Sequence, residues 1–471
     1  MGMDNAVVAQ RMAEGFEDFW LPSLNSPGHP DRMNYLPLGY WLESQWYNVF
    51  GSNSFTAEKV YSVLTYIIIA LLMIWIWRLI GMPKGTGWLP VLCWITIPLV
   101  TWSATNNLLE STLTIFVLLS VALLFLAGRD SLMALTRLSS GKPAGSYRVY
   151  CAIWLFLAAL SMELAFMVKG FTGLFPLFFP LLYWLVVRRQ KVAYPLFATV
   201  VILAVWIVTL FVVVIFSPDA YQHLYNYIHH QMIGGLLHVQ TVASRFYIIY
   251  VLLLQSIIPL TILALFCLIR IKNRPFYKYM FFWRFRKDLT AIQIEHSRLG
   301  WFMLVFGLSG ILPIMLGLKQ QEFYVVPMLP FFGIAMACLL YDLLEDWLLN
   351  INKTAHRVLI ALAVLIFGSG LVLNIDSVHK INSNQELLSD MRLILPQLYE
   401  GERISVSKEI LQMPEVEEYF YRYKNIVFDS LPGQPHYLSM YAVVDRFEGI
   451  VYSNLDLPTQ QYNLYVETCE L

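Results

Sequence analysis

Long apolar segments recur along most of the chain, and they restrict its fold more than any other feature of the sequence. Each has about 17 to 24 residues, enough for a helix to cross the roughly 30 Å hydrocarbon core of a bilayer. The segments predict about ten transmembrane helices, near residues 57–80, 88–105, 110–127, 150–167, 171–187, 193–216, 246–269, 299–317, 323–341 and 357–375. Because unpaired backbone groups are costly in lipid, we expect an all-α polytopic membrane protein.

The composition supports this class. Hydrophobic residues make up 58% of the 471 residues and aromatic residues 15%, and the mean hydropathy is +0.58, well above the range of soluble globular proteins. Basic and acidic residues balance at 32 each, so the charge gives no reason to expect a nucleic-acid partner. The five cysteines form no CxxC pair, which argues against a disulfide framework or a zinc site. No cofactor is indicated, and no apolar signal peptide opens the sequence.

The loops alternate in Lys and Arg content, and this alternation predicts which side of the membrane each loop faces. The basic loops, predicted to be cytoplasmic, lie at 78–84, 129–148, 188–191, 270–298 and 353–357. The first loop, the 218–245 segment and the tail after residue 374 are then external. Lone basic residues on the external side run against the trend and mark candidate binding groups: Lys169, Arg245 and Lys319.

Three segments follow from this pattern. Residues 1–56 form an external loop, 57–375 a transmembrane domain, and 376–471 a small external α/β domain that we interpret as a cap or partner-binding element. In the first loop, Asp4 opens a predicted amphipathic helix that ends at Gly15. In the tail, we expect helices near 384–400 and 407–421 and short strands such as NIVFD and GIVYS.

The order of motifs in the first loop resembles that of the GT-C glycosyltransferases, particularly the lipid A aminoarabinose transferases (ArnT type) and the protein O-mannosyltransferases. An acid opens a surface helix at Asp4, turn residues follow at 21–30, and Pro37-Leu38-Gly39-Tyr40-Trp41 precedes Phe50-Gly51. Two features depart from the family. A Glu-Lys pair usually stands where this chain has Tyr35-Leu36, which leaves the donor open. Family members also carry one more span before the acidic loop, so we expect a parent with one further helix.

The resemblance implies inverting transfer of a sugar from a polyprenyl-phosphate donor to an external glycan, lipid or protein acceptor, such as lipid A of the cell envelope, at the bacterial inner membrane. Asp4 would be the general base and Glu110 a second catalytic or acceptor-positioning carboxylate. The plainer alternatives are a helix N-cap for Asp4 and a first-turn acid favoured by the helix dipole for Glu110. No metal site is required; a divalent ion is compatible with the sequence but not indicated.

The same resemblance assigns the donor phosphate to Lys169 and Arg245. Lys169 lies in FMVKGFTG, similar to the Lys-Gly turn of the family, and Arg245 suits phosphate recognition. The alternatives are a lysine that extends to the membrane surface and an interfacial anchor. Tyr324, Tyr40 and His230 would line the donor and acceptor pocket, although tyrosine is common at membrane interfaces and His230 could be a solvated surface residue.

Two other functions are compatible with the pattern. A polytopic transporter or lipid-linked sugar flippase would also place lone charges in a membrane cavity. Against it stand the long aromatic first loop and the lack of Gly- or Pro-broken helices at matching positions in two halves. A membrane scaffold that works through its tail is the third alternative, and it would leave Lys169 unexplained.

Overall fold

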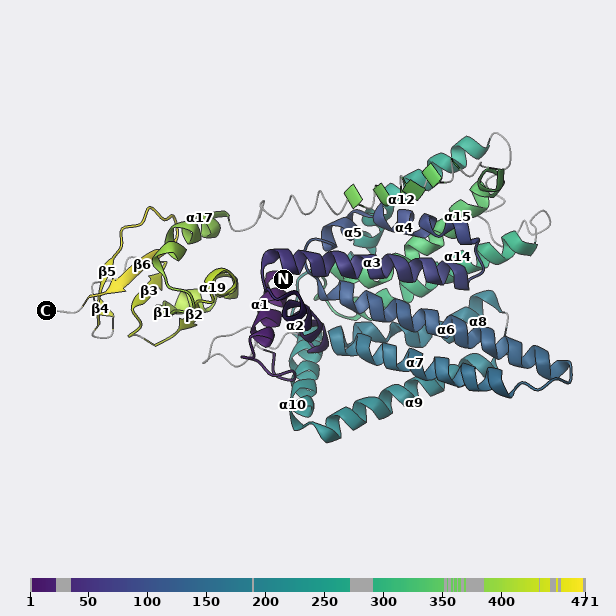
Figure 1. Cartoon of the computed structure of the whole chain (residues 1–471), viewed down its shortest axis with the longest axis horizontal. Helices are drawn as coiled ribbons and strands as arrows, with labels where there is room; N and C mark the ends of the chain where they lie inside the picture. Colours follow the sequence, from purple (N-terminus) through teal and green to yellow (C-terminus); the bar gives the residue numbers. More distant parts are fainter. Residues whose placement is uncertain are drawn as a thin grey trace. The chain divides into compact units, whose positions relative to one another are not determined.

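The computed structural model describes residues 2–22, 35–188, 190–271, 291–350, 385–431, 433–440, 446–447 and 450–468, with scattered residues between 354 and 369. The chain forms two compact units (Figure 1). One, here the membrane unit, comprises residues 59–375, and the other, the terminal unit, comprises residues 1–58 together with 376–471. The helix α3 (Phe55–Leu79) contains the boundary between the two sets of residues.

All the regular secondary structure in the described residues of the membrane unit is helical. Its elements after α3 are η1 (Lys84–Thr86), α4 (Trp88–Ile95), α5 (Pro98–Ser103), α6 (Leu109–Ser139), α7 (Gly145–Lys169), η2 (Gly170–Phe178), α8 (Phe179–Val187), α9 (Ala193–Phe216), α10 (Pro218–Asn226), η3 (Tyr227–Gly234), α11 (Gly235–Leu237), α12 (Tyr247–Ile271), α14 (Ala291–Ile311), η5 (Ile314–Leu316), η6 (Glu322–Met328) and α15 (Leu329–Asn350). Five segments of the described chain are long and apolar enough to cross a membrane: 55–79, 109–139, 145–187, 193–216 and 322–341.

The class of a polytopic membrane protein is therefore confirmed, whereas the count of about ten spans remains a prediction. Three predicted spans are interrupted or remodelled. The 88–105 segment divides into α4 and α5 at Pro98, 171–187 begins with the 3₁₀ helix η2, and 323–341 begins with the 3₁₀ helix η6. Proline lacks a backbone N–H and therefore disrupts α-helical bonding at these points. The predicted span at 357–375 lies largely outside the described residues.

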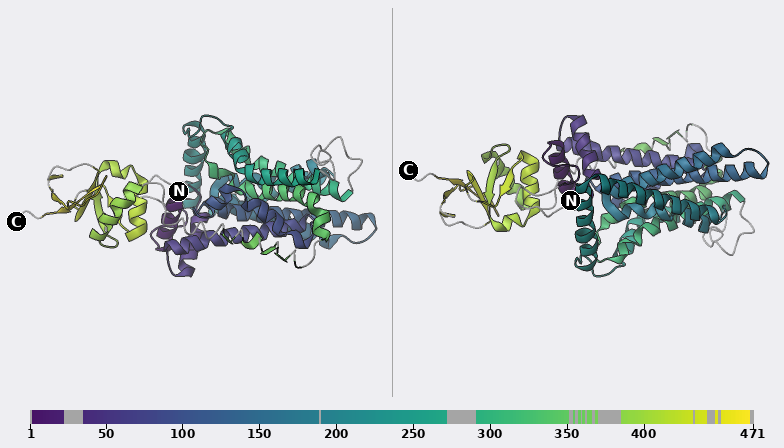
Figure 2. Two further views of the ribbon diagram at one scale, coloured as in Figure 1. Left: turned by 90° about the horizontal axis from the view of Figure 1, so that it is seen from above. Right: turned by 90° about the horizontal axis from the view of Figure 1, so that it is seen from below.

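The helices pack around an aromatic core. α6 and α7 form a long antiparallel pair, and α14 packs on α15, as Figures 1 and 2 show from three directions. Phe306 of α14 stacks edge-on against Phe331 of α15, with ring centroids 4.8 Å apart, and its centroid is 5.2 Å from that of Phe175 in η2. Most of the apolar part of α6 is buried inside the unit. In contrast, α9 presents its apolar side chains outward, which suits contact with lipid.

The tail folds as an α/β structure, as the sequence predicted. Its helices are α17 (Gln385–Ile394), η8 (Leu395–Gln397), α18 (Lys408–Leu411) and α19 (Pro414–Lys424). The strands β1 (Arg403–Val406), β2 (Val427–Asp429), β3 (His436–Ser439), β4 (Arg446–Phe447), β5 (Ile450–Asn454) and β6 (Asn463–Glu467) form one sheet in the order β2-β1-β3-β6-β5-β4. β1 pairs in parallel with β2 and β3, and the remaining pairs are antiparallel. Phe420 of α19 and Phe428 of β2 are fully buried in its core.

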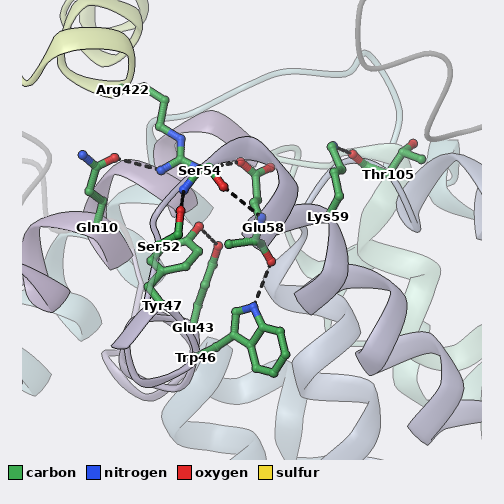
Figure 3. Close-up of polar contacts among 11 residues, drawn as sticks. Gln10, Glu43, Trp46, Tyr47, Ser52, Ser54, Glu58, Lys59, Thr105 and Arg422 are labelled. Atoms are coloured by element: carbon green, nitrogen blue, oxygen red, sulfur yellow. Dashed lines mark hydrogen bonds and ion pairs between the residues drawn. The ribbon is translucent and has the colours of Figure 1, made fainter. Parts of the chain in front are cut away.

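The N-terminal helices belong to this same unit. The predicted amphipathic helix is α1 (Gly2–Ala13), and α2 (Leu38–Phe50) follows it; α1 packs on both α2 and α19. Arg422 of α19 joins these elements, because it donates hydrogen bonds to Gln10 (2.8 Å) and to Glu58 (3.0 Å), as Figure 3 shows. Its guanidinium also lies 5.6 Å from the ring centroid of Tyr47 in α2.

Candidate active site

The centre of the candidate site is a buried ion pair between Glu110 and Lys169. Glu110 lies in the first turn of α6, and Lys169 is the last residue of α7. Because these helices are antiparallel, the start of one meets the end of the other, and the Lys169 ammonium contacts the Glu110 carboxylate directly. The two side chains are 7% and 2% exposed, respectively. Charges buried in a membrane domain are costly unless they are paired, so this pair is a candidate for function rather than a solvated surface contact.

Two aromatic rings cover the lysine. The Lys169 Nζ lies 5.1 Å from the ring centroid of Tyr324 and 5.2 Å from that of Phe323, both within cation–π range. These residues open η6, where Pro327 keeps the helix short and tight. The ammonium is thus held between a carboxylate and two aromatic faces.

The turn after Lys169 is fixed by close packing. Gly170 has φ 72° and ψ −143°, and a β-carbon there would lie 1.8 Å from the Tyr227 hydroxyl. That hydroxyl donates a hydrogen bond to the Lys169 carbonyl (3.4 Å). Burial raises the pKa of Tyr227 to about 12, so the hydroxyl keeps its proton at neutral pH. Glycine is therefore required for both its backbone conformation and its lack of a side chain.

A second lysine lies near this pair. The Lys319 ammonium donates a hydrogen bond to the Gln231 side-chain oxygen (3.0 Å), and it is half-buried. Burial and the positive charge of Lys169 lower the pKa of Lys319. One carboxylate and two ammonium groups leave a net positive charge among the three, which favours an anionic ligand.

Gln320 positions the loop that carries Lys319. Its side-chain nitrogen donates to the carbonyls of Arg245 (3.0 Å) and Gly317 (3.0 Å), and its side-chain oxygen accepts from the Ile248 backbone N–H (3.0 Å). This buried side chain connects the loop before η6 to the start of α12. The Tyr247 hydroxyl adds a further bond to Glu322 (3.1 Å) across the same two segments.

The structure brings together three of the predicted site residues: Glu110, Lys169 and Tyr324. Arg245 and His230 belong to the same unit, but both side chains are exposed. Asp4 and Tyr40 belong to the terminal unit, where Tyr40 is buried in α2. The roles of all seven residues remain predictions.

Two residues that the structure places at the site, Tyr227 and Gln231, were not among the candidates from the sequence. Lys319 was, because it is a lone basic residue in a loop predicted to be external. Tyr227 and Gln231 had no such signal, since one contacts Lys169 and the other Lys319 only through the tertiary fold.

Asp4 shares a hydrogen bond with another carboxyl group in the terminal unit. It lies in the first turn of α1 and pairs with Glu418 of α19. Burial and the negative charge of Asp4 raise the pKa of Glu418 well above its usual range. The pKa of Asp4 is lowered: burial acts to raise it, but the hydrogen bond from Glu418 is among the interactions that lower it. The two groups thus share one proton, with Glu418 as the donor and Asp4 as the acceptor.

No family model and no curated protein matches the sequence. The fold, however, is similar to that of ArnT from Cupriavidus metallidurans. Its crystal structure bound to undecaprenyl phosphate aligns over 100% of this chain and 94% of that one, with a TM-score of 0.60 and 13% identity. The chain has the GT-C fold. The apo structure of the same ArnT gives a TM-score of 0.59 at 14% identity, over 98% of this chain and 92% of that one. The GT-C fold predicted from the order of the loop motifs is thereby confirmed.

Proposed function

We propose that this chain is a membrane glycosyltransferase that moves a sugar from a polyprenyl-phosphate donor to a glycan, lipid or protein acceptor at the outer face of the bacterial inner membrane. The observation that carries the proposal is the buried Glu110–Lys169 pair with Lys319 beside it, in a chain with the GT-C fold. The similar ArnT structure holds undecaprenyl phosphate, a ligand of the same chemical class as the proposed donor lipid.

The charge at the site fits the chemistry of such a transfer. A sugar linked to a polyprenyl phosphate is a diester with one negative charge, and the departing lipid phosphate gains a second. Lys169 and Lys319 would stabilise this added charge, which develops only as the sugar–phosphate bond breaks. A low-dielectric setting strengthens that effect because little water screens the charges.

The aromatic rings and the carboxylate hold the Lys169 ammonium in position for this role. Glu110 supplies a counter-ion in the absence of donor, and Tyr324 and Phe323 limit the movement of the ammonium. A phosphate that arrives beside Lys169 would share the ammonium with Glu110. We therefore assign Glu110 to positioning of Lys169 and of the acceptor.

Asp4 is the proposed general base. Its hydrogen bond from Glu418 favours the ionised form that a base needs to accept the acceptor's proton. Arg245, an exposed side chain close to the Gln320 network, is proposed as a second phosphate ligand, and Tyr40 and His230 as pocket residues. With these roles, we propose that the acceptor displaces the lipid phosphate at the sugar C1 with inversion. The identity of the sugar is not part of the proposal.

The test measures sugar transfer from undecaprenyl-phosphate sugars and the binding of undecaprenyl phosphate itself, with purified full-length chain. Lys169→Met is expected to reduce transfer by about 100-fold, the usual effect of removing one charge-stabilising donor. Lys191→Met is the matched control, because Lys191 is an exposed lysine in the loop before α9. Equal transfer by the two variants would contradict the proposal.

A double variant separates catalysis from folding. Lys169→Met alone leaves Glu110 buried without its ammonium, whereas Lys169→Met with Glu110→Gln removes both charges. We expect the double variant to regain thermal stability but not transfer or lipid binding. Movement of a fluorescent undecaprenyl-phosphate sugar across vesicles without any transfer would instead favour the flippase.

A further inference from the structure

A cavity lies in the membrane unit, well away from the Glu110–Lys169 pair. It has a volume of about 310 Å³ and is lined mainly by the second half of α6, by α8 and by the start of α9. Gly128, in the wall of this cavity, is 18 residues further along α6 than Glu110, which corresponds to about 27 Å at 1.5 Å per residue. The cavity is therefore separate from the ion pair.

One part of the cavity is apolar and aromatic. Phe125 of α6 contacts Phe179 of α8 edge-on with ring centroids 4.8 Å apart, and Phe179 stacks on Tyr183 at 5.8 Å. Leu124 and Met133 extend this wall along α6. Such a surface suits an acyl chain, which brings no polar groups that need partners.

The other part is polar and contains an arginine. Arg129 lines the cavity with a side chain that is 55% exposed, and its Nε pairs with Asp130 (3.1 Å), a contact that leaves the terminal NH₂ groups available to a ligand. Asp130 is held separately by the Trp154 indole N–H (3.0 Å). Gln190 lines the same region and donates to the Gly128 carbonyl (3.0 Å).

The surrounding charges are also basic. Exposed basic side chains at this end of the helices, on or near the loops that join α6 to α7 and α8 to α9, are Arg137, Lys142, Arg148, Arg188 and Lys191. These are the loops predicted to be cytoplasmic, where anionic lipid is attracted to basic residues. Charge complementarity thus selects an anionic ligand over a neutral one.

We propose that this cavity binds one anionic phospholipid, with an acyl chain against the Phe125–Phe179 wall and the phosphate on the Arg129 guanidinium. An arginine can make two parallel hydrogen bonds to a phosphate. The basic side chains at this end of the helices disfavour the ammonium of a zwitterionic headgroup, which explains a preference for a lipid with net negative charge. This inference does not depend on the proposed glycosyl transfer.

Native mass spectrometry of the purified full-length chain, incubated with phosphatidylglycerol or phosphatidylcholine of the same acyl chains, tests the proposal. We expect phosphatidylglycerol to be retained about tenfold better, and Arg129→Gln to abolish that preference. Arg148→Gln is the control, because it removes the same charge from the same end of the helices but lies outside the cavity. Equal retention of the two lipids by the native chain would overturn the proposal.

A second variant covers the case in which Arg129→Gln does not fold, since that change disturbs the contact with Asp130. Ala198→Leu fills the cavity from α9 without changing any charge, and Ala198 is buried in its wall. We expect it to reduce retention of phosphatidylglycerol to the level of phosphatidylcholine. Unchanged retention would place the bound lipid elsewhere. Undecaprenyl phosphate that displaces the bound phosphatidylglycerol one for one would overturn the choice of a phospholipid.

Discussion

Replacement of Gly170 by alanine tests the geometry of the turn after Lys169. The native conformation, φ 72° and ψ −143°, lies in a region that only glycine adopts easily, and alanine there costs about 1–3 kcal/mol. A new β-carbon would also lie 1.8 Å from the Tyr227 hydroxyl, so the tyrosine must move and release the Lys169 carbonyl. We therefore expect Gly170→Ala to lose about 3 kcal/mol or more of stability and most of its lipid-phosphate binding.

The double variant Gly170→Ala with Tyr227→Ala divides this loss into two parts. It removes the steric overlap but keeps the backbone strain, so about 1–3 kcal/mol should remain lost beyond the effect of Tyr227→Ala alone. Gly145→Ala, at the other end of α7, is the control because a β-carbon there meets nothing within 4 Å. Thermal unfolding of each purified variant measures stability. Equal unfolding temperatures for Gly170→Ala and Gly145→Ala would refute the reasoning.

Three further predictions concern charged groups. Arg422→Ala should destabilise the terminal unit by about 3–5 kcal/mol, because it removes the buried ion pair between Arg422 and Glu58; denaturant unfolding measures this loss. For Glu418, the folded state keeps a proton that the unfolded state loses above its ordinary pKa of 4.5. Stability of α19 should therefore fall as the pH rises from 4.5 toward the raised folded pKa, and Glu418→Gln should flatten that profile in hydrogen-exchange measurements corrected for pH. Because the pKa of Lys319 is lowered from its ordinary value of 10.5, we expect binding of undecaprenyl phosphate to weaken as the pH rises toward that value. Lys319→Arg should move this loss to higher pH, because a guanidinium keeps its charge.

Each of these has its own control. Arg403→Ala removes an exposed arginine from the same unit and should cost little, so an equal loss in both variants would argue against the buried role of Arg422. Glu467→Gln changes an exposed acid and should leave the pH profile of α19 unaltered. If the loss of undecaprenyl-phosphate binding at alkaline pH is unchanged in Lys319→Arg, a group other than Lys319 is responsible for it.

The membrane class and the fold could be predicted because they depend on long-range composition and on the order of motifs. The length of the apolar segments indicated transmembrane helices, because backbone N–H and C=O groups without hydrogen bonds are costly in lipid. Glu110 and Lys169 were predicted individually from their positions at the ends of apolar segments. Their direct contact could not be predicted, because it requires the antiparallel register of α6 and α7, which 58 intervening residues do not encode in any visible pattern. The 3₁₀ start of η6, which turns Tyr324 toward the lysine, was also hidden in an apolar run.

The tail shows the same limit more strongly, and it changes how the first loop is understood. Arg422 bonds Gln10 across 412 positions of sequence, and Glu418 of the same helix bonds Asp4. A motif search treats the acidic helix and the tail as separate segments. In the folded chain they are one unit, and the tail supplies a hydrogen-bond donor that favours the ionised form of the proposed base. If Asp4 is that base, Glu418→Ala should shift the pH dependence of sugar transfer without touching the donor site, whereas Lys169→Met should lower transfer at every pH.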